Sequence, residues 1–360
     1  MRLGVEAALV DGRLVAGDVE VDGDCIARVG VRRPGRSIAV PGFVDLHVHG
    51  FGGVDFAAAD AAAYGRAGEA MLATGVTAFQ PTFVTAPEDE LVASLREVPS
   101  GDVGARILGA HLEGPFLSPR RLGMHPESAR RDPDVDLFGR LVAAGPVTHM
   151  TLAPELDGAL ELVDMLRAAG IVAACGHTDA TADDARAAFD RGATHVTHLF
   201  NAMRPFTHRD PGIAGAALVR DDVTLELILD GHHVSDEAAL IGWRAAPGRV
   251  ALVSDGMAAT GAGDGTWQMG PVPVEVRDGV VRTLGGVLAG SVLTMRDAVR
   301  GAVRLGVSFE EAVDAATRVP ARAARRTDVG RLERGAPADV VVLDADLQVT
   351  RVLVGGVERG

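Results

Sequence analysis

The fold is decided by residues 43–82, which hold two apolar segments separated by an Ala-rich one. These segments read FVDLHVHG (43–50), DAAAYGRAGEAMLATG (60–75) and TAFQPT (77–82). The first and third have the length and apolar content of buried strands. The middle one is an amphipathic helical stretch that ends in Gly, a common helix stop. A strand, a helix and a second strand in this order predict a repeating unit of a parallel sheet.

The same alternation continues to residue 256. Helical stretches such as DGALELVDMLRAAG and TADDARAAFDRG separate six further apolar segments. Eight units in total favour a (β/α)8 TIM barrel over an open doubly wound sheet. We therefore predict an α/β fold with a barrel at 43–329, whose later strands are ARILGAHLEG (105–114), VTHMTLAPE (147–155), IVAACGHT (171–178), HVTHLF (195–200), TLELILDG (224–231) and RVALVSDG (249–256).

Both ends of the chain differ in texture from the middle. The first forty residues read as short strands joined by turns, with Asp11-Gly12 as a hairpin turn, and residues 338–360 return to this pattern. We predict that residues 1–42 and 330–360 form one small β-sandwich domain. The alternating segment TWQMGPVPVEVRDGVVRTL (266–284) predicts a β-hairpin that is inserted after the eighth strand and joins the small domain.

Composition and charge restrict the kind of protein. The chain has 360 residues and a net charge of −14, which disfavours nucleic acid or an acidic membrane surface as a partner. It has no apolar run of the roughly 20 residues that a membrane helix requires. Its N-terminus does not resemble a secretory signal, so we expect a cytoplasmic protein. Cys25 and Cys175 show neither a disulfide framework nor zinc-finger spacing.

Residues that can bind a metal or move a proton fall at the carboxyl ends of five predicted strands, where TIM barrels carry their active sites. Side chains alternate along a strand, so the two histidines of the first strand point to one face. Imidazoles and carboxylates are suitable ligands for zinc or a related divalent ion. We therefore predict a metal site at the barrel mouth, from the six residues His47, His49, Glu113, His177, His198 and Asp255.

Two features refine this prediction. The chain contains no lysine, which excludes the carbamylated lysine that bridges two ions in many barrel hydrolases. A bridging ligand must then be Asp or Glu, and Glu113 is the obvious candidate. Asp255 fits either a further ligand or an acid–base that activates water and protonates the leaving amine, and we favour the second role. His111 and His195 are interpreted as structural.

The motifs resemble those of the N-acetylglucosamine-6-phosphate deacetylase family of the amidohydrolase superfamily. They occur in family order over residues 41–291 and read PGFVDLHVHG, HLEGPF, GHTDAT, HLFNAM, HRDPG, DGHHV, VSDG and LAGS. The resemblance implies hydrolysis of N-acetyl-D-glucosamine 6-phosphate to D-glucosamine 6-phosphate and acetate. It also implies that Glu113, His177 and His198 are the primary metal ligands and that Asp255 is the general base and then the acid.

The resemblance assigns substrate contacts as well. His125 is expected near the scissile amide, and Arg209 is expected to bind the phosphate at the site of a neighbouring subunit, which implies a homodimer. The remaining contacts are expected at Met124, Asn201, Ala202, His233, Leu288, Ala289 and Gly290. One divalent ion per subunit is expected. Zinc is favoured over iron, manganese or cobalt, and a weaker second ion at His47 and His49 is left open.

Three other functions are alternatives to this one. A deacetylase of N-acetylgalactosamine 6-phosphate would share the metal chemistry and differ at contacts to the sugar C4 position. A cyclic-amide hydrolase leaves Arg209 and the HLFNAM segment without a purpose. A catalytically inactive barrel acting as a binding or assembly protein would have lost ligands or the acid–base, whereas this chain retains all of them.

Overall fold

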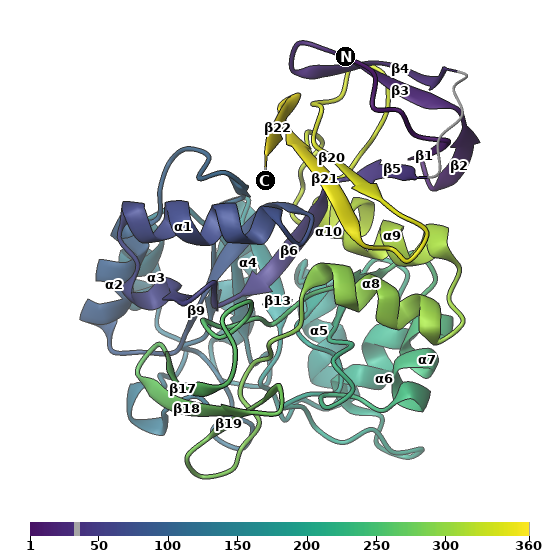
Figure 1. Cartoon of the computed structure of the whole chain (residues 1–360). Coiled ribbons are helices and arrows are strands. Elements are labelled where there is room, and N and C mark those ends of the chain that lie inside the picture. The colour runs from purple at the N-terminus through teal and green to yellow at the C-terminus, as the bar shows by residue number, and fades with distance from the viewer. Residues whose placement is uncertain (32–36, 360) are drawn as a thin grey trace.

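The computed structural model describes residues 1–31 and 37–359, and its centre is an eight-stranded parallel barrel (Figure 1). The barrel closes where the N–H of Asp255 donates to the carbonyl of His47 at 2.9 Å, beside a parallel bridge between Val48 and Gly256. The predicted α/β barrel is confirmed. In spatial order the strands are β6 (Phe43–Val48), β9 (Val76–Val84), β11 (Ala110–Glu113), β12 (Val147–Leu152), β13 (Val172–Cys175), β14 (His195–Val196), β15 (Thr224–Leu227) and β16 (Val250–Leu252).

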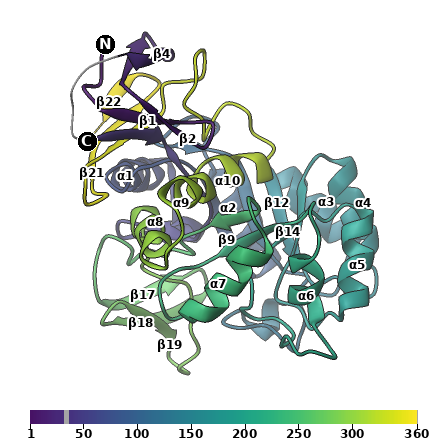
Figure 2. The same ribbon diagram turned by 90° about the vertical axis from the view of Figure 1, so that its right-hand side faces the viewer.

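Helices surround the barrel and bury their apolar faces against it (Figure 2). Most begin at an Asp, Ser or Thr whose side chain accepts a hydrogen bond from a backbone N–H of the first turn, which explains where they start. The helices are α1 (Ala61–Leu72), α2 (Glu88–Glu97), α3 (Val135–Ala144), α4 (Ala159–Ala168), α5 (Ala182–Arg191), α6 (Gly212–Leu218), α7 (Asp236–Ala245), α8 (Met295–Arg304), α9 (Phe309–Ala316) and α10 (Arg318–Ala323). No helix among the described residues is long and apolar enough to cross a membrane.

Strands from both ends of the chain form a separate six-stranded sheet. Its order is β2 (Arg13–Ala16), β1 (Ala7–Val10), β5 (Ile38–Pro41), β20 (Val340–Leu343), β21 (Val349–Val354) and β22 (Val357–Arg359). A second layer, β3 (Asp18–Asp22) paired with β4 (Cys25–Val31), shares an apolar core with it. The sheet from both termini agrees with the prediction, and the Asp11-Gly12 turn joins β1 to β2. The domain boundaries at 42 and 330 stay predictions.

The segment predicted as a hairpin at 266–284 is a three-stranded sheet of β17 (Gly265–Met269), β18 (Val272–Arg277) and β19 (Val280–Thr283). Among the described residues it pairs with neither the terminal sheet nor the barrel, which differs from the prediction that it joins the small domain. The two views place it on the far side of the barrel from the terminal sheet (Figures 1 and 2). Its apolar face packs on Val84, the last residue of β9, and on Met257 and Ala258, which follow β16.

The two accessory sheets therefore mark opposite ends of the barrel. Strand β5 ends at Pro41 and β6 begins at Phe43, so the terminal sheet continues directly into the amino end of a barrel strand. The β17–β19 sheet packs on the last residue of β9 and on residues that follow the carboxyl end of β16. It thus flanks the end of the barrel where the sequence predicts the functional site.

Candidate active site

Three side chains from the ends of three barrel strands converge on one point. Glu113 is the last residue of β11, and His177 and His198 follow β13 and β14. The Oε1 atom of Glu113 lies 3.0 Å from Nε2 of His177 and 2.9 Å from Nε2 of His198. The two Nε2 atoms are themselves 3.0 Å apart. All three side chains are buried, so their donor atoms face one another in a water-poor pocket.

The hydrogen bond on the far side of the His177 ring tests whether these residues fit a metal. The Nδ1 atom of His177 lies 3.0 Å from the carbonyl of Arg121, which can only accept, so Nδ1 carries the proton. Neutral His177 then directs an Nε2 lone pair at the Glu113 oxygen. Lone pairs aimed at a carboxylate oxygen repel it unless a cation lies between them. Two imidazole nitrogens and a carboxylate oxygen suit zinc or a similar divalent ion.

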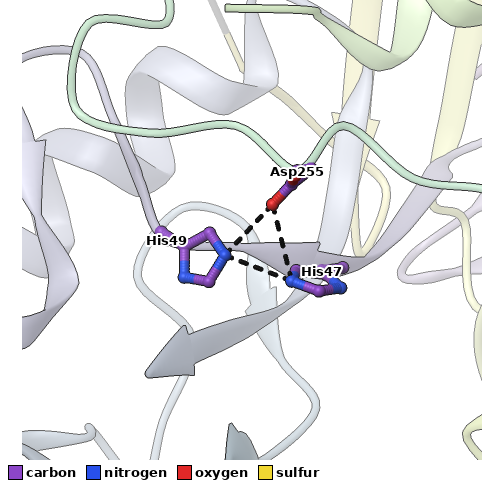
Figure 3. Close-up of side chains that lie close together, drawn as sticks. All are labelled: His47, His49 and Asp255. Carbon is purple, nitrogen blue, oxygen red and sulfur yellow. Dashed lines mark hydrogen bonds and ion pairs between the residues drawn. The ribbon is translucent and has the colours of Figure 1, made fainter. Parts of the chain in front are cut away.

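His47, His49 and Asp255 form a second group beside the first (Figure 3). The Nε2 atoms of the two histidines are 3.1 Å apart, and Oδ1 of Asp255 lies 3.1 Å from Nε2 of His49. The Nδ1 atom of His49 donates to the carbonyl of Thr82 at 3.1 Å, which again leaves Nε2 as the free lone pair. Glu113 adjoins this group too, because its Oε1 lies 3.6 Å from Nε2 of His47. A carboxylate next to both groups has the placement that a bridging ligand requires.

The two carboxylates of the site are held in their charged forms. Burial alone would raise the pKa of Glu113, but the imidazoles of His47, His125 and His177 lower it well below its usual range. Burial would likewise raise the pKa of Asp255. The surrounding imidazoles of His49, His47 and His233 outweigh burial, so that this pKa is also lowered. Each side chain is therefore held as a carboxylate that can bind a cation.

His125 supplies a fixed hydrogen-bond donor. The backbone N–H of Thr85 donates to its Nδ1 at 3.1 Å, so neutral His125 must carry its proton on Nε2. Burial, together with the neighbouring His177, lowers the pKa of His125 to about 4, which keeps the ring neutral. The Nε2 atom lies 3.3 Å from Oε2 of Glu113 and therefore faces the same space as the candidate metal ligands.

The backbone at three of these residues adopts a conformation that L-residues rarely use. The φ angles of His177, His198 and Asp255 are +47°, +31° and +49°. Non-glycine residues in the left-handed region cost free energy and cluster at functional sites, where the surrounding structure enforces them. The turns after β13, β14 and β16 therefore aim these side chains inward.

A cavity of about 210 Å³ joins these residues to most of the predicted substrate contacts. His47 lies buried beneath it, and Ala289 is buried among apolar side chains beside it. Arg209 is exposed and is not part of the lining. The lining includes His49, Glu113, Met124, His125, His177, His198, Asn201, Ala202, His233, Asp255, Leu288 and Gly290.

Some residues of the site were absent from the sequence prediction. Gly123, Met269 and Val287 also line the cavity, and Met269 comes from the β17–β19 sheet. Asp230 accepts a hydrogen bond from Nδ1 of His233 at 2.7 Å and so fixes that ring. Glu226 lies beneath the site and was missed although it carried a signal, since an acid within the apolar segment TLELILDG needs buried partners.

A barrel that gathers imidazoles and carboxylates at its strand ends defines a class of metal-dependent hydrolases. The chain belongs to the amidohydrolase family, whose model matches residues 38–358, and its relatives place it among the N-acetylglucosamine-6-phosphate deacetylases. The family and the candidate ligand groups support a divalent metal cofactor.

The relatives cover nearly the whole chain. It is 39% identical to the N-acetylglucosamine-6-phosphate deacetylase of Mus musculus, over 89% of this chain and 83% of the relative. It is 37% identical to the N-acetylgalactosamine-6-phosphate deacetylase of Escherichia coli O157:H7, over 91% and 89%. A mutant N-acetyl-D-glucosamine-6-phosphate deacetylase of Mycobacterium smegmatis, solved with N-acetyl-D-glucosamine 6-phosphate, superposes with a TM-score of 0.95 at 41% identity, covering 99% of this chain and 98% of that one.

Proposed function

We propose that this chain removes acetate from N-acetyl-D-glucosamine 6-phosphate and releases D-glucosamine 6-phosphate. One observation carries the proposal. A single cavity holds the candidate ligands Glu113, His177 and His198, the carboxylate of Asp255 and the donor His125, in a chain of the deacetylase family. An inactive barrel is not favoured, because the groups that hydrolysis needs are all present and converge.

Glu113, His177 and His198 would hold one divalent ion, and we propose zinc. A divalent ion held there supplies Lewis-acid chemistry, which lowers the pKa of water and polarises an amide carbonyl. His47 and His49 would take a weaker second ion, with Glu113 shared between the two. The lack of lysine supports this role for Glu113.

The other side chains of the cavity would transfer protons or bind the substrate. Asp255, held as a carboxylate, would take a proton from the attacking water and deliver it to the amine that leaves. His125 would donate a hydrogen bond from its Nε2–H to the carbonyl oxygen as negative charge develops there. His233, oriented by Asp230, would bind the sugar next to Asp255, whose Oδ2 lies 3.9 Å from its Nε2.

The phosphate end of the substrate requires a cation that the cavity lining lacks. We propose that Arg209 of a second subunit supplies it in a homodimer, since this arginine is exposed and lies outside its own cavity lining. A guanidinium fork matches phosphate oxygens in geometry and charge. A cytoplasmic location fits such a metabolic enzyme and stays part of the proposal.

A deacetylation screen tests the function. Acetate release would be measured for N-acetylglucosamine and N-acetylgalactosamine, each with and without the 6-phosphate, on zinc-loaded and metal-stripped protein. We expect the highest kcat/KM for N-acetylglucosamine 6-phosphate and a loss of activity after stripping. The second candidate is the galactosamine substrate, which is favoured by the relative from Escherichia coli O157:H7. Hydrolysis of neither phosphorylated sugar would overturn the proposal.

A further inference from the structure

Glu226 is a fully buried carboxylate on β15 that sits directly beneath the candidate active site. Its two oxygen atoms receive three N–H groups. Oε1 accepts from Nε2 of His195 at 3.0 Å, and Oε2 accepts from Nδ1 of His47 at 3.0 Å. Oε2 also accepts from the backbone N–H of His198 at 3.1 Å. Glu226 therefore contacts one residue from each of the two candidate ligand groups.

The first contact decides which way His47 presents its lone pair. A carboxylate at Nδ1 keeps the proton on that nitrogen, so neutral His47 has its lone pair on Nε2. That Nε2 lies 3.1 Å from Nε2 of His49, 3.5 Å from Oδ1 of Asp255 and 3.6 Å from Oε1 of Glu113. The opposite tautomer would point an N–H at the centre of the site and exclude a cation from it.

The second contact holds the turn that carries His198. Strand β14 ends at Val196, and His198 then adopts a φ of +31°. Glu226 binds this turn twice, because its backbone carbonyl also accepts from the N–H of Leu199 at 2.9 Å. A conformation that L-residues avoid persists only where its surroundings enforce it, and Glu226 supplies two of the bonds that do so here.

We propose that Glu226 is a positioning residue that fixes Nε2 of His47 toward the metal site and holds the turn that aims His198 into it. The carboxylate is suited to this because it offers only acceptors to three surrounding donors. An amide of the same shape offers one oxygen and places an NH2 group against another N–H. At least one of the three N–H groups must then lose its acceptor or its ring must change tautomer.

The test compares Glu226→Gln with the control His149→Gln. His149 is buried in the same interior and stacks on His111 at 4.3 Å between ring centroids. It hydrogen-bonds Gln80 and not Glu226, so its replacement disturbs the buried cluster while leaving the proposed contacts in place. Zinc affinity of the metal-stripped proteins would be measured by competition with a chelator, and kcat and KM from acetate release.

We expect Glu226→Gln to lower zinc affinity or kcat by about 10- to 100-fold with little change in KM, as found for residues that orient metal ligands. His149→Gln should leave zinc affinity and kcat close to those of the wild type. Wild-type zinc affinity and kcat in Glu226→Gln would overturn the proposal. Equal losses in both variants would overturn it too, because they would report general damage to the interior.

The tautomer of His47 in the wild-type protein gives a test that needs no variant. Long-range ¹H–¹⁵N NMR should show a proton on Nδ1 of His47 both with and without zinc, whereas a ring that carries its only proton on Nε2 would overturn the proposal. The kinetic readout rests on the proposed function, but zinc affinity and the NMR signal do not. A wild-type protein that releases no acetate would therefore reject the function and leave the role of Glu226 to these two measurements.

Discussion

Asp255 holds its carboxylate between two imidazoles, with Oδ1 at 3.1 Å from Nε2 of His49 and Oδ2 at 3.9 Å from Nε2 of His233. Asn has the same shape but cannot take up a proton from water. We expect Asp255→Asn to lower kcat by about 100- to 10,000-fold while KM stays close to the wild type, since general acid–base catalysis contributes factors of this size. Acetate release measures the effect, and equal zinc content in both proteins is the control. Unchanged turnover would show that Asp255 takes no part in the proton transfers.

His111 gives the folded state a definite pH dependence. Burial and the neighbouring His47 lower its pKa from 6.5 to about 3. The unfolded chain binds a proton at this residue below pH 6.5 and the folded protein does not, so the free energy of unfolding falls as pH drops from 6.5 toward 3. One such group contributes a slope of about 1.4 kcal/mol per pH unit.

The variant His111→Gln removes this contribution. Urea unfolding between about pH 6 and about pH 4 should show a shallower loss of stability than in the wild type, by the slope of one proton. The variant is less stable at neutral pH because its hydrogen bond to Thr151 is altered, so the slopes and not the absolute values are compared. Equal slopes in the two proteins would mean that His111 is already protonated when folded.

The sequence could predict which site residues lie together, but it could not predict how their imidazole rings are oriented. Strand-end placement alone predicted that His47, Glu113 and His177 would lie together, since the carboxyl ends of barrel strands share one rim. The proton on Nε2 of His125 depends on the N–H of Thr85, forty residues away in the chain. His195 was interpreted as structural, and its bond to Glu226 appears only once β14 and β15 are paired.

Helix α5 shows how one local pattern supports the site. Thr181 and Asp184 form a capping box at its start, just after the turn that carries His177. We expect Thr181→Ala to lower the free energy of unfolding by about 1 kcal/mol, because the N-cap loses its side-chain acceptor. Thr181→Ser retains the hydroxyl and should restore most of it. Calorimetry measures both variants, and a stability loss equal in Ala and Ser would show that the methyl group matters instead.

Strand lengths were less predictable than strand positions. The segment 195–200 reads as one apolar strand, but β14 has only two residues because the chain turns away at His198 to enter the site. The alternating pattern at 266–284 predicted strands correctly, yet alternation cannot say which surface will cover the apolar face. In the structure, Met257 and Ala258 at the barrel mouth cover the apolar face of this sheet.

The exposed loop with Arg209 gives a prediction for the assembled molecule. Arg204 donates to Oδ2 of Asp210 at 2.7 Å, which ties the two ends of this loop together and leaves Arg209 pointing outward. We expect Arg209→Ala to raise KM for the phosphorylated sugar by roughly 10- to 100-fold, the loss expected for a charged hydrogen bond to phosphate, with unphosphorylated sugar unaffected.

Two controls accompany this variant. Arg186 lies on helix α5, exposed and paired with Asp183, and Arg186→Ala should leave KM unchanged for both sugars. Light scattering should show a dimer for wild type and variant alike. An equal rise in KM for both sugars would show that Arg209 does not bind the phosphate. A monomer with full activity would show that the site needs no residue from a second subunit.

The terminal sheet ties the order of synthesis to the order of folding. Strand β5 pairs on one side with β1, which leaves the ribosome shortly before it, and on the other with β20 from near the end of the chain. While the barrel residues are translated, the edge of β5 that later pairs with β20 has no partner strand. An unpaired strand edge can form hydrogen bonds with other chains. The last strands translated complete the sheet begun by the first. A nascent chain that stalls before residue 340 therefore exposes the unpaired edge of β5, which is prone to aggregation.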